Sequence, residues 1–321
     1  MMNKFFWGSN TARGFVSYAL EFYPRAQRRV LIKSGPGTGK STFLTKVAEA
    51  TPEPVIFYCS SAPSSLDAIA DFSKGYFIAD ATYPHVLEPE VVGARDEILD
   101  LGMFLDKNKL KTDYEKIVKL KNLSKQHFSL AYATLNKALK VRDVLEEIEE
   151  PSREIDKGFV EIYAELRELD LPRRAVLGES EKRFVSAYTP LGYRQLKVDN
   201  NALSIYLLRL RPTERTRYFH VLSQFFLGLG YDVWFFIDPL DGISFEGLYI
   251  PDKEIYIKAE WSLPENDLLQ IYENEKTAAI EELKKASLVH EELEKIYIDA
   301  MDFDSLNSYL AQVLIDVIKA E

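Results

Sequence analysis

The segment that most constrains the fold of this chain is glycine-rich and spans residues 30–47, VLIKSGPGTGKSTFLTKV. An apolar, β-branched run precedes Gly35, Gly37 and Gly39, and residues with helical periodicity follow, which predicts a strand, a loop and a helix. Glycine allows several backbone N–H groups to converge on one anion, because no side chain obstructs the required φ and ψ values. We expect the helix to begin near Lys40 and to direct the positive end of its dipole at the same place. The segment therefore predicts an α/β fold with a phosphate-binding loop.

The loop also assigns chemistry to particular side chains. The usual pattern is G-x-x-x-x-G-K-[ST], and here Ser34 stands at its first position. We expect the Lys40 ammonium to bridge the β- and γ-phosphates of a nucleotide, and the Ser41 hydroxyl to bind Mg²⁺. An ordinary strand-to-helix turn is the alternative interpretation. The predicted nucleotide-binding residues are Gly35, Pro36, Gly37, Thr38, Gly39, Lys40, Ser41 and Thr42.

A loop of this kind needs an acid to position Mg²⁺, normally at the end of a neighbouring apolar strand. The patterns at 55–59 and 76–79 predict two strands, and Asp80 directly follows the second. We therefore expect Asp80 to bind Mg²⁺ and to take part in catalysis. Asp67, which follows the other strand, is the competing acid, and a solvated aspartate at a strand end is the alternative for Asp80.

Candidates for activating water lie just beyond Asp80, where His85, Glu88 and Glu90 follow the carboxyl end of a strand. Ligand sites gather at that edge of α/β sheets. His85 is the predicted catalytic residue, and the alternative is that it packs or caps while the glutamates are solvated. An arginine that stabilises transition-state charge could come from a partner chain or from this one. The candidates in this chain are Arg13, Arg28, Arg29 and Arg95.

An internal repeat runs through the chain. Residues 5–15 align with 183–193, 31–43 with 207–219, 65–78 with 244–257, and 137–148 with 285–296. Four blocks in the same order favour a tandem duplication. The second copy has Thr213, Arg215, Thr216 and Arg217 where the first has Gly37, Gly39, Lys40 and Ser41. Without these glycines and the lysine, the second copy cannot easily form a phosphate site, so we predict one nucleotide site per chain.

Several segments together resemble a group of bacterial P-loop ATPase-like proteins found mostly in Gram-positive organisms. They are FFWGSNTARGFVSY, KSGPGTGKST, YCSSAPSSLDAI and IADATYPHVLEPEVVGARDEILDLG. The resemblance is strongest over residues 5–105 and weaker over 181–315. It implies tandem P-loop units with mainly parallel sheets in three layers, and it implies ATP as the nucleotide, with hydrolysis. Members of the group tend to keep glycine at the position of Ser34 and a recognisable second loop, and this sequence departs from them in both.

The repeat and the breaker residues suggest two units. The first spans 1–169 with a helical arm at 105–148, residues 170–180 form a linker, and 181–321 form the second, degenerate unit with acidic helices between 267 and 318. Apolar residues recur at three- and four-residue steps along the first arm, which predicts a long amphipathic helix.

The two arms differ in charge. Residues 105–142 contain ten Lys or Arg against three Asp or Glu, while 265–304 contain four Lys against twelve Asp or Glu. One hypothesis is that the arms attract each other, within the chain or across a homodimer; the alternative is two solvated faces. A third option is RNA binding by the basic arm. With a net charge of -10, nucleic acid is an unlikely partner of the whole chain.

The cysteine content and the apolar segments of the sequence indicate in which cellular compartment the protein functions. Cys59 is the single cysteine, so no internal disulfide can form. The first residues lack the long apolar core of a signal peptide, and polar residues interrupt the most apolar stretch, 221–240. We expect a soluble cytoplasmic protein that does not enter a membrane.

The leading functional prediction is a Mg²⁺-dependent ATPase with ATP and Mg²⁺ as its cofactors. One alternative is a kinase that transfers the γ-phosphoryl group to a small molecule or nucleotide, with Asp67 orienting the acceptor. The other is a nucleotide-gated scaffold with negligible turnover, which the retained second unit would suit.

Overall fold

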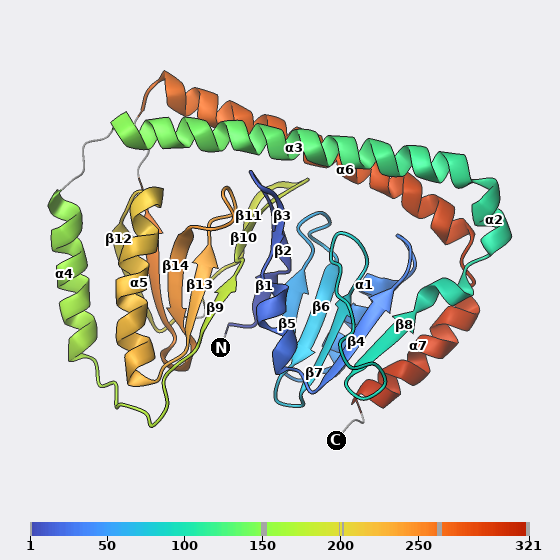
Figure 1. Ribbon diagram of the computed structural model, residues 1–321, viewed down its shortest axis with the longest axis horizontal. Coiled ribbons are helices and arrows are strands. Elements are labelled where there is room, and N and C mark those ends of the chain that lie inside the picture. The colour runs from blue at the N-terminus through green and yellow to red at the C-terminus, as the bar shows by residue number, and fades with distance from the viewer. Residues whose placement is uncertain (1, 149–152, 199, 201, 262–264, 319–321) are drawn as a thin grey trace.

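Two β-sheets of similar design, each covered by helices, lie side by side beneath a pair of long helices (Figure 1). The structure is a computed structural model that describes residues 2–148, 153–198, 200, 202–261 and 265–318. It is a mixed α/β protein, as the sequence predicts.

The first sheet contains the predicted phosphate loop, and its strand order is β1-β5-β6-β7-β4-β8. The strands are β1 (Lys4–Phe6), β4 (Arg28–Lys33), β5 (Val55–Tyr58), β6 (Leu66–Asp71), β7 (Tyr76–Asp80) and β8 (Asp96–Asp100). The sheet is mainly parallel, because only β6 runs against its neighbours. Helix α1 (Lys40–Ala50) follows β4 and buries Phe43, Leu44 and Val47. The predicted strands at 55–59 and 76–79 and the predicted helix start at Lys40 are thus confirmed.

The second sheet repeats this design, with strand order β12-β15-β14-β13-β9. The strands are β9 (Ser180–Arg183), β12 (Ser204–Arg209), β13 (Val233–Ile237), β14 (Phe245–Ile250) and β15 (Ile255–Glu260). Their directions match those of β1, β4, β5, β6 and β7 in turn, so here parallel and antiparallel pairings are equal in number. Helix α5 (Pro212–Leu229) follows β12 as α1 follows β4.

A four-stranded antiparallel sheet joins the two units, and the sequence did not predict it. Its order is β11-β10-β2-β3, from the hairpins β2 (Gly8–Thr11) with β3 (Gly14–Ser17) and β10 (Ser186–Thr189) with β11 (Gly192–Gln195). The hairpins turn alike: the glycine opening the second strand of each, Gly14 or Gly192, has φ of 102° or 103°. In each turn a threonine hydroxyl, of Thr11 or Thr189, donates to that glycine's carbonyl over 2.8 Å. The alignment of Gly14 with Gly192 is therefore reproduced in three dimensions.

The helical arms form one long antiparallel pair above the sheets (Figure 1). Helices α2 (Lys107–Thr112) and α3 (Tyr114–Ile148) form the first arm, and α6 (Asp267–Asp299) forms the second. The contact between α3 and α6 is mainly apolar, with Leu135 and Leu283 fully buried in one cluster. His127 Nδ1 and Glu282 Oε2, 2.7 Å apart, make one charged contact across the pair. The three lysines of the basic arm at positions 116, 119 and 121 are exposed.

The shorter helix that follows each arm packs on the other unit, not on the unit to which it belongs in the sequence. Helix α4 (Arg153–Glu168) packs on the second sheet, where Leu166 is buried with Phe219. Helix α7 (Phe303–Ile318) packs on α1 of the first unit, where Leu306 lies in the same cluster as Phe43. The boundary predicted near residue 169 therefore separates the units along the sequence but not in space.

Short 3-10 turns complete the fold at Ala19–Glu21, Tyr23–Arg25, Leu101–Phe104 and Pro251–Lys253. None of the helices in the described ranges has the length and apolar character that crossing a bilayer requires.

Candidate functional site

The segment 34–39 links β4 to α1 and has the backbone conformation of a tight glycine-rich loop. Gly37 has φ of 67° and Gly39 has φ of 85°, values that residues with a β-carbon rarely adopt. Gly39 is the N-cap of α1, so the free N–H groups of the first helical turn face the loop. The Thr38 hydroxyl donates to the Gly35 carbonyl over 2.9 Å and closes the turn.

Lys40 and Asp80 lie together at this loop. The Lys40 ammonium donates to the Gly35 carbonyl over 2.5 Å and is 3.6 Å from Asp80 Oδ2. Asp80 reaches this place because β7 is the parallel neighbour of β4, with Asp80 opposite Ile32 at the carboxyl edge of the sheet. Its Oδ1 accepts the N–H of Thr82 over 2.9 Å, which fixes the orientation of the carboxylate.

Ser41 contacts the backbone of the residue that precedes Asp67. The Ser41 hydroxyl oxygen accepts the N–H of Leu66, the residue before Asp67, over 2.9 Å. The pKa of Asp67 is raised to about 6, mainly by burial; the charge of Asp80 also acts to raise it, while His85 and Lys40 act to lower it. Both competing acids, Asp67 and Asp80, are therefore within electrostatic reach of the loop lysine.

His85 contacts Asp67, and both side chains are largely buried. Its Nε2 is 3.3 Å from Asp67 Oδ2, and its ring meets the rings of Trp7 and Phe15 edge-on. Cys59 lies in the same group, and single ligand atoms of Cys59, Asp67 and His85 all lie within 4.8 Å of one another. These three could hold a metal ion. Burial raises the pKa of the Cys59 thiol well above its usual range, however, so the thiol is protonated near neutral pH.

In the loop between β7 and β8, Glu90 pairs with Arg95 of the same loop and with Arg29 of β4. Arg29 is buried, with its guanidinium 3.8 Å from the centre of the Tyr23 ring and Nη1 3.2 Å from Glu90 Oε2 and 3.4 Å from Asp96 Oδ1. Arg95 pairs with the same Glu90 carboxylate. Asp96 also accepts the N–H groups of residues 90 and 91, and hydrogen bonds from these N–H groups help lower its pKa although burial opposes this. The arrangement indicates a structural role for these side chains, which hold the loop against β4.

Two of the other charged candidates, Arg28 and Glu88, are also engaged in structural contacts. Arg28 pairs with Glu97 over 2.7 Å, and Glu88 pairs with Lys33 over 3.2 Å. Arg13 is exposed in the turn between β2 and β3. Of the residues proposed for catalysis, the structure thus brings Lys40, Asp80 and His85 to one place, together with Asp67.

The loop is covered by helices from the second half of the chain, which sequence reasoning missed. A β-carbon at Gly35 would lie 2.4 Å from two ring carbons of Tyr297, and one at Gly37 would lie 3.0 Å from the Glu294 carbonyl oxygen. A β-carbon at Gly39 would lie 3.4 Å from Leu306 of α7. Glycine is therefore required here both by backbone conformation and by the close approach of α6.

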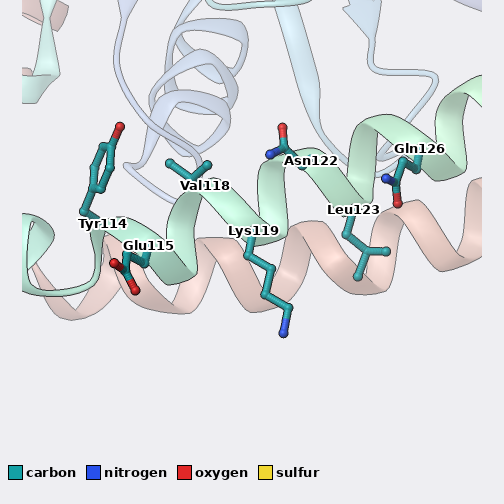
Figure 2. Close-up of a pocket in the computed structure, with 7 residues that line it drawn as sticks. All are labelled: Tyr114, Glu115, Val118, Lys119, Asn122, Leu123 and Gln126. Carbon is teal, nitrogen blue, oxygen red and sulfur yellow. The ribbon is translucent and has the colours of Figure 1, made fainter.

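Two surface hollows differ in their relation to this loop. One is a groove between α1 and α7, lined by Gly39, Thr42, Phe43, Lys46, Phe303, Leu306, Asn307, Leu310, Ala311 and Leu314. The other is a shallow depression on the first turns of α3, lined by Tyr114, Glu115, Val118, Lys119, Asn122, Leu123 and Gln126 (Figure 2). The second is formed by one helix alone, and none of its lining residues belongs to the loop 34–39.

The corresponding place in the second unit has no phosphate loop. Two residues separate β12 from α5, which begins at Pro212, so Thr213, Arg215 and Arg217 lie within the helix. The Glu214 carboxylate accepts the N–H of Arg211 over 3.1 Å in a capping box. This geometry agrees with the prediction that the second copy has lost its glycine-dependent anion site.

No protein-family model matches the chain, and neither the curated proteins nor the solved structures contain a match.

Proposed function

We propose that the N-terminal unit binds ATP together with Mg²⁺ at the loop 34–39 and hydrolyses it. The observation that carries the proposal is the loop itself, in which Gly37 and Gly39 have left-handed φ values at the start of α1. Lys40 lies beside them, between the Gly35 carbonyl and Asp80. A helix N-terminus, free N–H groups and a lysine together form an anion site.

The available donors suit a magnesium nucleotide. The loop N–H groups and the Lys40 ammonium would hold the phosphates. Ser41 and Asp80 offer hydroxyl and carboxylate oxygens, the hard ligands that Mg²⁺ prefers, and the ion would neutralise phosphate charge. The choice of ATP over other nucleoside triphosphates comes from the family resemblance alone.

Asp67 and His85 are the pair that we propose for orienting and deprotonating the attacking water. They are in contact with each other, and Asp67 interacts with both Lys40 and Asp80. A histidine held by a carboxylate is a common general-base arrangement. On this proposal His85→Gln lowers the hydrolysis rate while leaving nucleotide affinity within about twofold.

Phosphate release from ATP tests the proposal. Lys40→Ala is expected to lower the rate by about a hundredfold or more, because it removes charge stabilisation of the moving phosphoryl group. Lys46→Ala removes the same charge from an exposed position on the same helix and is expected to leave the rate unchanged. Equal rates for the wild type and Lys40→Ala would contradict the proposal.

A nucleotide-gated scaffold is the second candidate, favoured by the close approach of α6 and α7 to the loop. Helices that must move for a nucleotide to enter would report its presence whether or not it is hydrolysed. Tight binding of ATP without phosphate release would favour the scaffold. Loss of ATP only in the presence of an acceptor would favour a kinase.

A further inference from the structure

The last turns of α6 lie directly on the phosphate loop. Tyr297 covers Gly35, and a β-carbon placed on Gly35 would lie 2.4 Å from its ring. The backbone of Glu294 and the side chain of Ile298 cover Gly37, and a β-carbon placed there would lie 3.0 Å from the Glu294 carbonyl oxygen and 3.0 Å from Ile298 Cγ1. Because Glu294 is in this group, a carboxylate side chain starts within van der Waals distance of the loop that is built to receive an anion.

In the second unit, the equivalent glutamate makes hydrogen bonds with the start of the helix. Glu146 of α3 accepts the N–H of Thr213 over 3.0 Å and its hydroxyl over 2.7 Å, so a carboxylate of the long helix caps the first turn of α5. Thr213 is the counterpart of Gly37 in the internal repeat. The block that aligns 137–148 with 285–296 pairs Glu146 with Glu294.

The neighbours of the two glutamates also correspond. Arg142 Nε is 3.6 Å from Glu146 Oε1, and its aligned residue, His290, has Nε2 3.5 Å from Glu294 Oε1. In both units, therefore, the long helix places a basic side chain and a glutamate, one turn apart, at the connection after β4 or its counterpart β12. In the second unit, where the connection has no glycine-rich loop, the glutamate accepts a free N–H of the first helical turn, that of Thr213.

In the first unit the electrostatic surroundings also favour a carboxylate anion. The hydrogen bond with His290 is the main cause that lowers the pKa of Glu294, and the charge of Lys40 and the N–H of Gly37 lower it too, while burial opposes them. The same lysine and the same N–H are groups that a nucleotide phosphate would use. A carboxylate and a phosphate cannot both have them, so their binding is competitive.

We propose that Glu294 is an internal competitor of the nucleotide: its carboxylate occupies the anion position of the phosphate loop, and nucleotide binding displaces it together with the last turn of α6. The inference rests on the proposed nucleotide site. It assigns a regulatory role to the second half of the chain, because α6 begins in the second unit and ends on the loop of the first.

Displacement would be transmitted to neighbouring elements. The Lys109 ammonium of α2 donates to the Asp299 carbonyl over 2.9 Å, and the N–H of Asp106 donates to the Ala300 carbonyl over 2.7 Å. Helix α7 begins at Phe303, three residues further on, and packs on α1. The end of α6 is thus linked to both the first arm and the helix that follows the loop.

The test compares nucleotide affinity in the full chain by titration with a fluorescent methylanthraniloyl ATP analogue. Glu294→Gln keeps the shape of the side chain but removes the competing charge, so it is expected to bind about tenfold more tightly than the wild type, the factor expected for one charge-assisted hydrogen bond. Glu292→Gln removes the same charge from an exposed position on the same helix and is expected to bind like the wild type.

Three outcomes are informative. If the wild type binds and Glu294→Gln binds no more tightly, the inference is wrong while the nucleotide site stands. If neither protein binds, the proposed function fails, and the inference with it. Binding by Glu294→Gln alone supports the inference in its strongest form.

Hydrogen exchange supplies a readout that does not depend on a substitution. Adding the ATP analogue to the wild type is expected to increase amide exchange at 294–300 while it slows exchange in the loop 34–39. Unchanged or slower exchange at 294–300 on binding would show that the end of α6 is not displaced, and would overturn the inference.

Discussion

At the residue scale, the two units share a carboxyl group at one unusual backbone position. Asp67 is the extra residue of a β-bulge between β5 and β6, and Glu246 is the extra residue of the matching bulge between β13 and β14. Burial is the main cause that raises the pKa of both, to about 6 for Asp67 and to about 8 for Glu246. A bulge turns a side chain away from the regular alternation of a strand, which explains how a carboxyl group comes to be buried at this position in each unit.

The raised pKa of Glu246 predicts a pH-dependent stability. Its carboxyl titrates near 8 when folded and near 4.5 in its ordinary state, so between these values the folded chain binds more protons than the unfolded one. The free energy of unfolding contributed by this group is therefore highest at low pH and falls as pH rises through that window. Glu246→Gln removes the titration and can still accept the Ser186 hydroxyl that now donates to Glu246 over 2.7 Å.

Urea unfolding of the wild type and Glu246→Gln at several pH values checks this. We expect the difference in free energy of unfolding to move in favour of the variant between about pH 5 and 8, by no more than about 1.4 kcal/mol per pH unit, and to level off above. Parallel curves across that range would show that Glu246 titrates normally in the folded protein.

The site residues were only partly predictable from sequence, for physical reasons. Lys40, Ser41 and the glycines follow from a local motif whose backbone requirements are visible in the residue types. Asp80 follows from the strand that precedes it. Two other contacts depend on the tertiary fold: the pairing of His85 with Asp67 and the contact of Glu294 with the loop. For the contact of Glu294, the only signal in the sequence was the alignment of the blocks around 146 and 294.

At the element scale, the long helices are held together by apolar packing. Ala131, Leu135 and Ala138 of α3 and Ala279 and Leu283 of α6 are fully buried in one cluster. Alanines let the helices approach closely, and leucines fill the remaining space. The opposite charges of the two arms, from which the sequence suggested attraction, lie largely on exposed faces, because periodicity rather than net charge decides which side of a helix is buried.

Two variants of α3 separate packing from charge. Leu135→Ala is expected to lower the free energy of unfolding by about 2–5 kcal/mol, because it leaves a cavity in the contact between the helices. Reversing the charge of Lys116, Lys119 and Lys121 together is expected to cost less than about 1 kcal/mol, since these side chains are exposed. Denaturant unfolding measures both, and a larger loss for the charge reversal would show that electrostatic attraction dominates.

At the scale of the whole molecule, the two units are interlocked. Helix α4 belongs to the first half of the sequence and packs on the second sheet, while α7 belongs to the second half and packs on α1. The hairpins of both halves also form one antiparallel sheet. The repeat itself was predictable from aligned blocks, but this exchange was not, because each helix is amphipathic and its pattern does not say which sheet it covers.

Splitting the chain tests the interlocking. A fragment of residues 1–169 lacks α7, which covers Phe43 and Leu44 of α1, and exposes the apolar face of α4. We expect it to show no cooperative thermal transition alone, and to regain one when mixed with a fragment of residues 170–321. A cooperative transition for the first fragment alone would show that the units fold independently.

We expect the chain to have one nucleotide site, formed by the loop 34–39 of the first unit. Equilibrium dialysis with labelled ATP and Mg²⁺ counts that site directly. We predict about one ATP bound per wild-type chain and none at the same concentrations for Lys40→Ala, with thermal unfolding confirming that the variant is folded. Two bound nucleotides per chain, or binding that survives Lys40→Ala unchanged, would contradict it.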